Sequence, residues 1–207
     1  MRALSSGLTI PWRASEAVRR LKEESAFSFR LCDEMLLRRL VGEALSYEYN
    51  DQDERVNKHG VRQKLGTFEA FPTQSLFPRL RDLVLALLQS KFETLSEYPF
   101  KTPLFLNSVV LQRYKKGPLG ITPHIDGPSR RNLVCVLVLA GEGDFALHDD
   151  KDGKNTRTIE APPGHMIMMR APGFLGEDFQ PVHSITNITE DRYIVGLRER
   201  VAPPSSV

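Results

Sequence analysis

Hydrophobic residues recur at helical spacing along the first half of the chain. Ser15 precedes EAVRRLKEE, which predicts a first helix with Ser15 as its N-cap. Asp33 precedes EMLLRRLVGEAL, whose leucines repeat every three or four residues, and Pro78 opens a third helical pattern, RLRDLVLALLQSKF. Between the last two patterns, residues 51–75 are polar and rich in turn formers, which predicts a hairpin or loop.

The second half changes to short apolar or β-branched runs separated by Gly, Pro and Asp. These runs are SVVLQRY, NLVCVLVL, DFALH, TRTIEA, HMIMMR and RYIVGLR, and Asp152-Gly153 is a hairpin signal between two of them. We therefore expect an α+β fold, a double-stranded β-helix (jelly roll) with N-terminal helices packed on one sheet. Residues 1–200 would form a single domain with a strand-rich core over about 104–200, and 201–207 a flexible tail.

Composition narrows the class of protein only moderately. The chain has 207 residues, 41% hydrophobic and 26% charged, which is ordinary for a globular protein. No apolar run reaches the roughly 20 residues that a membrane helix needs, and the N-terminus lacks the apolar stretch of a signal peptide. We expect an intracellular protein, cytoplasmic or nuclear, with no membrane partner. The net charge of +2 neither requires nor excludes nucleic acid, and Cys135 is expected to be a buried free thiol.

The tripeptide His124-Ile-Asp126 is the first candidate for chemistry. On an extended segment, residues i and i+2 point to the same side, so one nitrogen and one carboxylate would face a shared point. A further histidine would complete a two-histidine, one-carboxylate triad, which leaves open positions on iron(II). The competing interpretation is a surface turn, favoured by the flanking Pro123, Gly127 and Pro128.

Three histidines are candidates for the third ligand. His148 opens the acidic hairpin and is expected to be solvated, whereas His165 lies in a turn before MIMM. His183 stands at the expected start of a strand near the C-terminus.

Two arginines follow on one face of the last expected strand. Period-two alternation places Arg192, Ile194, Gly196 and Arg198 together. An inward-facing arginine is costly unless it meets an anion, and two of them suit a dicarboxylate, with Gly196 leaving room for it. Arg200, by contrast, is expected to be solvated.

Together these residues resemble the AlkB group of iron(II)- and 2-oxoglutarate-dependent oxygenases. The resemblance is carried by NSVVLQRYKKG, by His124-Ile-Asp126, by His183-Ser-Ile and by RYIVGLR, and it is strong over roughly residues 107–198. It implies that His124, Asp126 and His183 ligate iron(II). It also implies four contacts to 2-oxoglutarate: Arg192 at the distal carboxylate, Arg198 near the carboxylate bound at the metal, and hydrogen bonds from Tyr114 and from Gln112, which stands where the group usually has Asn.

The resemblance implies a reaction with 2-oxoglutarate and O2 as co-substrates that hydroxylates a C–H bond. An alkylated nucleobase in DNA or RNA, oxidatively demethylated, is the leading expectation. The basic lid over 55–64, the pairs Lys115-Lys116 and Arg130-Arg131, and base stacking on Phe68 or Phe71 would support it. Gly127-Pro128 after the metal motif and the small net charge favour the alternative, a hydroxylase of a small molecule or protein side chain. A jelly roll that binds without catalysis is a third possibility, which the intact set of ligands opposes. The oligomeric state is left open.

Overall fold

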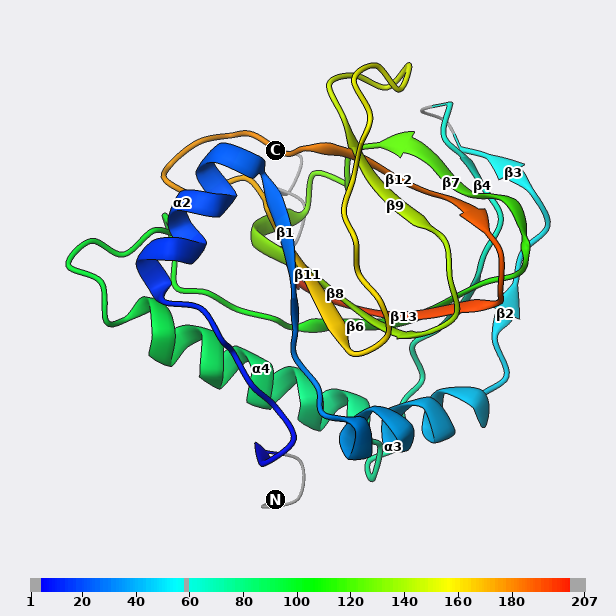
Figure 1. Cartoon of the computed structure of the whole chain (residues 1–207), viewed down its shortest axis with the longest axis horizontal. Helices are drawn as coiled ribbons and strands as arrows, with labels where there is room; N and C mark the ends of the chain where they lie inside the picture. Colours follow the sequence, from blue (N-terminus) through cyan, green and yellow to red (C-terminus); the bar gives the residue numbers. More distant parts are fainter. Residues whose placement is uncertain (1–4, 58–59, 202–207) are drawn as a thin grey trace, which may run out of the picture.

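Two antiparallel sheets lie face to face in the computed structural model, which describes residues 5–57 and 60–201 (Figure 1). The larger sheet has the order β1–β11–β8–β13–β6–β5–β2, and the smaller sheet has the order β10–β9–β12–β7–β4–β3. The larger sheet comprises β1 (Ala26–Arg30), β2 (Asn50–Asp51), β5 (Gly66–Phe68), β6 (Ser108–Tyr114), β8 (Arg130–Ala140), β11 (His165–Arg170) and β13 (Arg192–Arg200). The smaller sheet comprises β3 (Arg55–Val56), β4 (Arg62–Gln63), β7 (Gly117–His124), β9 (Asp144–His148), β10 (Arg157–Thr158) and β12 (Val182–Ile188).

From β6 onward the chain passes back and forth between the two sheets. Strands β6, β8, β11 and β13 belong to the larger sheet, and β7, β9, β10 and β12 belong to the smaller one. This alternation makes a double-stranded β-helix, so the expected α+β jelly roll is confirmed. It also brings strands distant in sequence together at one end of the sandwich.

The helices cover the outer face of the larger sheet. They are α2 (Ala14–Glu24), α3 (Glu34–Leu45) and α4 (Leu76–Phe92), and α3 and α4 run beneath this sheet in Figure 1. Their buried side chains share one apolar cluster with Leu111, Cys135 and Val195 of the sheet. The expected packing of N-terminal helices on one sheet is therefore confirmed.

Helix starts depend on caps: the predicted start after Asp33 is correct, and the other two predicted starts are two residues late. The Asp33 carboxylate accepts a hydrogen bond from the Leu36 amide at 2.8 Å, as expected of an N-cap. The first helix instead begins at Ala14, because the Ala17 amide already donates to the Arg13 carbonyl.

The third helix begins at Leu76, ahead of Pro78. Ser75 caps it, and the Glu43 carboxylate accepts from the Leu76 amide at 3.0 Å. Pro78 then falls in the first turn, where its missing N–H breaks no helical hydrogen bond.

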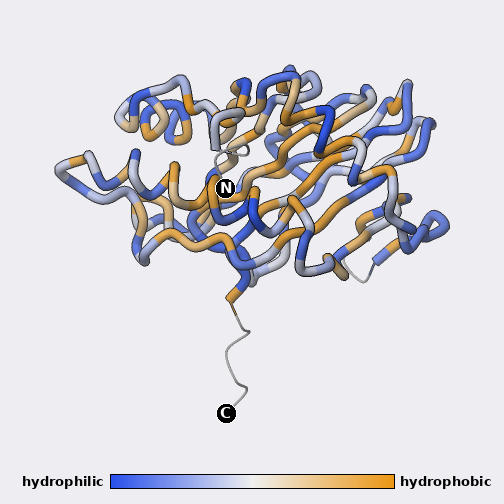
Figure 2. The backbone as a smooth tube through the Cα atoms, turned by 90° about the horizontal axis from the view of Figure 1, so that it is seen from below, coloured by the Kyte–Doolittle hydropathy of each residue, from blue (hydrophilic) through white to orange (hydrophobic). Residues whose placement is uncertain are grey.

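A second core lies between the sheets. Residues alternate along β13: Ile194 faces the space between the sheets with Tyr114 and Val136, whereas Val195 and Leu197 face the helices. Figure 2 shows the apolar positions gathered along these inner strands and the polar ones along the loops. The predicted two-faced β13 is therefore correct.

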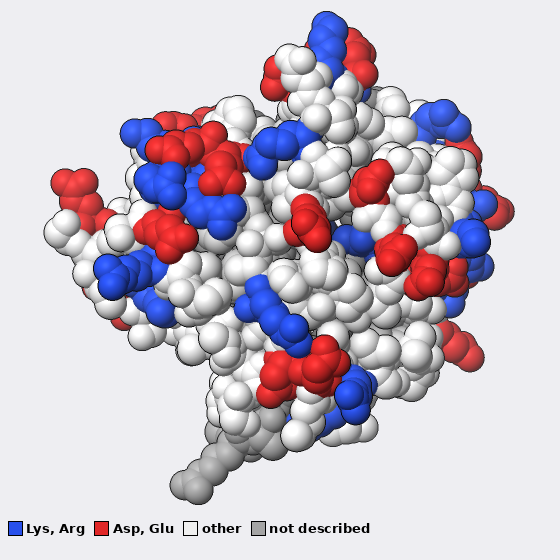
Figure 3. Space-filling model, viewed as in Figure 1, with Lys and Arg blue, Asp and Glu red and all other residues white. Residues whose placement is uncertain are grey.

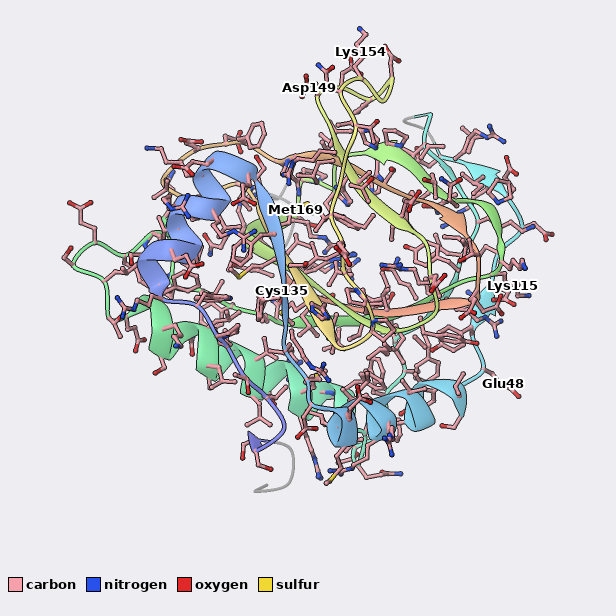
Figure 4. All side chains as sticks on the ribbon, viewed as in Figure 1. Glu48, Lys115, Cys135, Asp149, Lys154 and Met169 are labelled. Carbon is pink, nitrogen blue, oxygen red and sulfur yellow. The ribbon has the colours of Figure 1, made fainter. Side chains whose placement is uncertain are left out.

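The six expected strands were all found at least in part, but several observed strands were not predicted. DFALH and HMIMMR match β9 and β11, and the hairpin at Asp152-Gly153 joins β9 to β10. This hairpin projects beyond the body of the protein, with Asp149 and Lys154 on it in Figure 4. Strands β1, β7 and β12 were not predicted in full. Of the run TRTIEA only Arg157–Thr158 is strand.

The structure tests several expectations about the whole chain only in part. Both Cys32 and Cys135 are buried and free, and Cys135 lies inside the body of the protein in Figure 4. Among the described residues, no helix is long and apolar enough to span a membrane. Residues 202–207 of the expected tail lie outside the described residues, and the single-domain assignment stays a prediction.

Candidate metal centre and co-substrate pocket

The two candidate histidines are neighbours across a strand pair. His124 ends β7 and His183 is the second residue of β12, and the antiparallel register places them opposite each other. Their ring centroids lie 4.3 Å apart, and the Phe145 ring stacks on His183 at 5.6 Å. Residues 59 positions apart in sequence are thus held together by sheet hydrogen bonding.

Asp126 completes a three-residue cluster just beyond the end of β7. One ligand atom from each of His124, Asp126 and His183 lies within 4.8 Å of the others. The Asp126 Oδ2 atom is buried and has no hydrogen-bond partner within the protein. A buried carboxylate oxygen without a donor is costly, so this atom fits a cation. Two imidazoles and one carboxylate are the donor set of a facial triad for iron(II).

Backbone carbonyls fix which nitrogen of each ring faces the cluster. His124 Nδ1 lies 2.9 Å from the Thr122 carbonyl, and His183 Nδ1 lies 3.3 Å from the Pro181 carbonyl. A carbonyl only accepts hydrogen bonds, so each Nδ1 carries the proton and donates it. Each Nε2 is then an unprotonated lone-pair donor, which is the form that binds metal.

Burial and charge set the protonation states that a metal requires. Burial lowers the pKa of His124 to about 3, with His183 adding to the effect, and burial also lowers the pKa of His183. Burial alone would raise the pKa of Asp126, but nearby positive groups, Arg198 first among them, hold it at about 2. At neutral pH both rings are neutral and the carboxylate is ionised, so no proton must leave before a cation binds.

Arg192 and Tyr114 lie side by side on neighbouring strands of the larger sheet. They are register partners on β13 and β6, and both are buried. Arg192 Nη1 donates to the Gly143 carbonyl at 2.6 Å, while its Nε is buried without a partner. Burial lowers the pKa of Arg192 and raises that of Tyr114. A buried guanidinium with one neutral partner is well suited to an incoming carboxylate.

Arg198 and Gln112 meet on the cavity wall nearer to the metal ligands. Arg198 Nη2 lies 3.5 Å from Gln112 Oε1, a long hydrogen bond. A Cβ at Gly196 would meet Arg198 Nη2 at 3.1 Å, so the guanidinium lies back across this glycine. The absence of a side chain at Gly196 therefore makes room for the Arg198 guanidinium, and the expectation that this glycine leaves room for a ligand stays a prediction.

The ligand cluster lies in the wall of a cavity of about 760 Å³ between the sheets. Tyr114, Gln112 and Arg198 line this cavity, but Arg192 does not. The wall also includes Arg131, which the sequence analysis named only as part of a basic pair. It further includes residues that sequence patterns did not single out: Ile125, Lys151, Asp178, Phe179 and Gln180. Most lie in loops, where no periodicity signals a role.

The other two candidate ligands lie elsewhere. His148 is half-buried, contrary to the expectation that it is solvated, because its Nε2 lies 2.8 Å from Ser184 Oγ and its Nδ1 lies 2.9 Å from Thr156 Oγ1. His165 begins β11 in the larger sheet and does not line the cavity. Of the three candidates for a third ligand, only His183 joins His124 and Asp126.

Comparison of the fold identifies a class of similar structures. A prolyl hydroxylase in complex with a hypoxia inducible factor oxygen degradation domain peptide fragment, from Trichoplax adhaerens, matches with a TM-score of 0.64 at 13% identity, covering 90% of this chain and 88% of that one. A 2OG-Fe(II) oxygenase family oxidoreductase from Burkholderia pseudomallei matches with a TM-score of 0.61 at 12% identity, over 91% of both chains. A prolyl-4-hydroxylase from Pseudomonas putida gives 0.60 at 15% identity, over 91% of this chain and 99% of that one. No protein-family model matches the sequence, and no curated protein matches it.

The chain therefore shares its fold with these two prolyl hydroxylases and this 2OG-Fe(II) oxygenase, and it carries a His–Asp–His cluster between its two sheets. The jelly-roll fold expected from the sequence is supported by these similar structures. The narrower AlkB resemblance is not, because these similar structures are prolyl hydroxylases or a family oxygenase.

Proposed function

We propose that this chain is an iron(II)- and 2-oxoglutarate-dependent hydroxylase that oxidises a C–H bond of a protein side chain or a small molecule. The observation that carries the proposal is the convergence of His124, Asp126 and His183 in one cavity wall within a fold shared with such oxygenases. Iron(II) with bound 2-oxoglutarate and O2 supplies the oxidising chemistry, which yields succinate, CO2 and a hydroxylated product.

The chain's own residues would bind and orient the participants. The two Nε2 atoms and the Asp126 carboxylate hold the metal, and the Thr122 and Pro181 carbonyls keep both rings in the required tautomer. Arg192 would bind the distal carboxylate of 2-oxoglutarate beside its register partner Tyr114, whose hydroxyl would donate a hydrogen bond to the co-substrate. Arg198, with Gln112 beside it, faces the carboxylate at the metal. The apolar wall of Ile121, Val136, Phe145, Ile185 and Ile194 limits the entry of water.

Similarity favours a protein or small-molecule substrate over a nucleobase. Two of the similar structures are prolyl hydroxylases, and one of those contains a peptide fragment. For this chain, a peptide side chain entering the open end of the cavity is consistent with the amides and apolar groups there, Gln63, Gln180, Ile125 and Phe179.

Of the features expected to support nucleic acid, Arg131 and the lid residues Asn57, Val61 and Gln63 line the cavity, whereas Phe68, Phe71 and the pair Lys115-Lys116 do not. Phe68 and Phe71 pack against each other and Tyr47 beside the helices, and neither lines the cavity. In the basic lid, Arg62 pairs with Glu54, and next to it Lys115 pairs with Asp51. Lys58 and His59 lie outside the described residues. On the face in Figure 3, basic and acidic side chains are interspersed, so this face offers no continuous basic surface for phosphates.

Two measurements test the proposal. The first is binding of Mn(II), as a redox-inert substitute for iron, followed by electron paramagnetic resonance. His124→Ala and Asp126→Ala should lose it, and His165→Asn, a histidine outside the cluster, should keep it. The second is succinate release from 2-oxoglutarate with iron(II) and O2, which His124→Ala and Asp126→Ala should also lose and His165→Asn should also keep. Wild-type metal affinity in both cluster variants would refute the assignment.

A further inference from the structure

Two arginines near the metal ligands lack protein counter-charges. Arg130 begins β8 and Arg198 lies on β13, the strand paired with β8. Arg130 Nε and Nη1 and Arg198 Nε are buried and have no hydrogen-bond partner. Among the described residues, neither guanidinium forms an ion pair with any Asp or Glu. Both arginines are half-buried, and guanidinium nitrogens that have neither water nor a protein partner are costly, so this arrangement favours a bound anion.

The acids nearest to Arg130 do not supply that anion. Burial lowers the pKa of Arg130, and the positive charge of Arg198 lowers it further. Asp126 and Glu69 oppose this effect. Glu69 is exposed, and Asp126 is committed to the metal in the proposed function.

Loading the site leaves the imbalance in place. Arg198 lines the cavity and Arg130 lies on the paired strand outside the cavity wall, so with a divalent metal they bring four positive charges near this end of the cavity. Asp126 and the metal-bound carboxylate of 2-oxoglutarate bring two negative charges, since the distal carboxylate belongs with Arg192. The loaded site therefore keeps an excess of positive charge, which another anion would neutralise.

The residues at the open end of the cavity also carry a net positive charge. Its wall carries Arg131 and Lys151 against one acid, Asp178. Arg131 Nη1 donates to the Pro128 and Arg130 carbonyls, so its charge is fixed beside Arg130. A negatively charged molecule would thus be attracted to the entrance of the cavity and also bound at the end near the metal ligands.

We propose that the primary substrate carries an oxyanion, a carboxylate or a phosphate, and that Arg130 binds this group while the target C–H bond lies over the metal. This proposal rests on the hydroxylase function, and it adds the charge of the substrate and a specificity residue. Arg198 then neighbours both anions, that of the co-substrate and that of the substrate.

The test uses protein loaded with Mn(II) and 2-oxoglutarate without O2, so that no turnover occurs. Inorganic phosphate and acetate, as probes of the two oxyanion classes, are titrated calorimetrically. We expect at least one of them to bind wild type, Arg130→Gln to weaken it at least tenfold, and Arg130→Lys to retain part of the affinity. Arg200→Gln, which removes an exposed arginine on the neighbouring strand, should bind like wild type. The affinity for 2-oxoglutarate should be the same in Arg130→Gln as in wild type.

Three results would overturn the proposal. They are no binding of either probe to wild type, equal binding by Arg130→Gln, or a parallel loss in Arg200→Gln that signals unspecific attraction. If Arg130→Gln weakened 2-oxoglutarate as much as phosphate, Arg130 would serve the co-substrate instead. Failure of Mn(II) or 2-oxoglutarate to bind wild type would refute the hydroxylase function, independently of the role of Arg130. Phosphate titration of the metal-free wild type and Arg130→Gln proteins would then still decide whether Arg130 holds an oxyanion.

Discussion

Replacing Arg192 by Met should separate the stability of the protein from its affinity for 2-oxoglutarate. Arg192 is only 3% exposed, and its guanidinium makes one hydrogen bond to a neutral carbonyl. Met fills a similar volume without a charge. Replacing a buried, unpaired charge by an apolar group is often neutral or stabilising, so the ligand-free variant should melt at or above the wild-type temperature.

The ligand-bound protein should behave in the opposite way. Hydrogen bonds to charged groups contribute about 1.5–3 kcal/mol, and losing about 2 kcal/mol weakens binding roughly 30-fold. At a 2-oxoglutarate concentration about one hundred times the wild-type Kd, binding stabilises wild type by about 2.7 kcal/mol but the variant by only about 0.9 kcal/mol. In a chain of this size about 1 kcal/mol shifts Tm by about 2–4 °C, so the ligand should raise Tm by about 5–11 °C in wild type and by about 2–4 °C in the variant.

The assay is thermal unfolding with Mn(II), with and without 2-oxoglutarate, in the absence of O2. Arg200→Met is the matched control, because it makes the same substitution at an exposed position of the same strand. It should leave the ligand-induced shift at the wild-type value. A full wild-type shift in Arg192→Met would mean that the distal carboxylate binds elsewhere, and the role assigned to Arg192 would have to be abandoned.

Three further predictions concern stability and reactivity. Burial raises the pKa of Glu199, whose Oε2 accepts from Asn132 Nδ2 at 2.8 Å, so its ionised form is penalised in the folded state. Glu199→Gln should therefore be more stable than wild type at pH 7. Below about pH 4 the Glu199 carboxyl is protonated in both the folded and the unfolded wild-type protein, so thermal melts there should show no difference in stability between the variant and wild type. Burial raises the pKa of both Cys32 and Cys135 to about 12, so iodoacetamide should label neither thiol at pH 8 until the protein is denatured, as read by mass spectrometry. Asp33→Ala removes a helix cap worth about 1 kcal/mol, which predicts a Tm lower by about 2–4 °C; an unchanged Tm would mean that water replaces the cap.

Periodicity predicted those parts of the fold whose local pattern agrees with their final packing. The second helix matched at both ends because its apolar face and its Asp33 cap specify the same segment. Strand β7 escaped prediction because it contains Gly117, Pro118, Gly120 and Pro123, which have low strand propensity. It forms a strand through pairing with β12 and β4, and such pairing partners cannot be identified from local sequence.

The candidate site was predictable to a similar extent. The period-two spacing of His124 and Asp126, and of Arg192 and Arg198, survives in any extended segment, so these residues could be selected from the sequence. Arg130 was selected only as half of the basic pair Arg130-Arg131, expected to contact nucleic acid, and its relation to Arg198 could not be predicted. Its significance comes from burial between neighbouring strands and from the missing acid, and both are properties of the tertiary structure.

The cluster depends on strand register more than on any single side chain. His183 and Ile185 both line the cavity, while Ser184 between them faces His148. A register irregularity between His183 and Ile185 adjusts β12 against β7 at this point. A slip by one residue would turn His183 to the opposite face, so the pairing that stabilises the smaller sheet is also what brings the two imidazoles together. The open end of the cavity is formed instead by loops, the β9–β10 hairpin and the start of β8, which carry Phe179, Lys151 and Arg131 respectively. Substitutions there can change the substrate without disturbing the sheet register on which metal binding depends, so Arg131→Gln should alter substrate affinity while leaving the affinity for Mn(II) at the wild-type value.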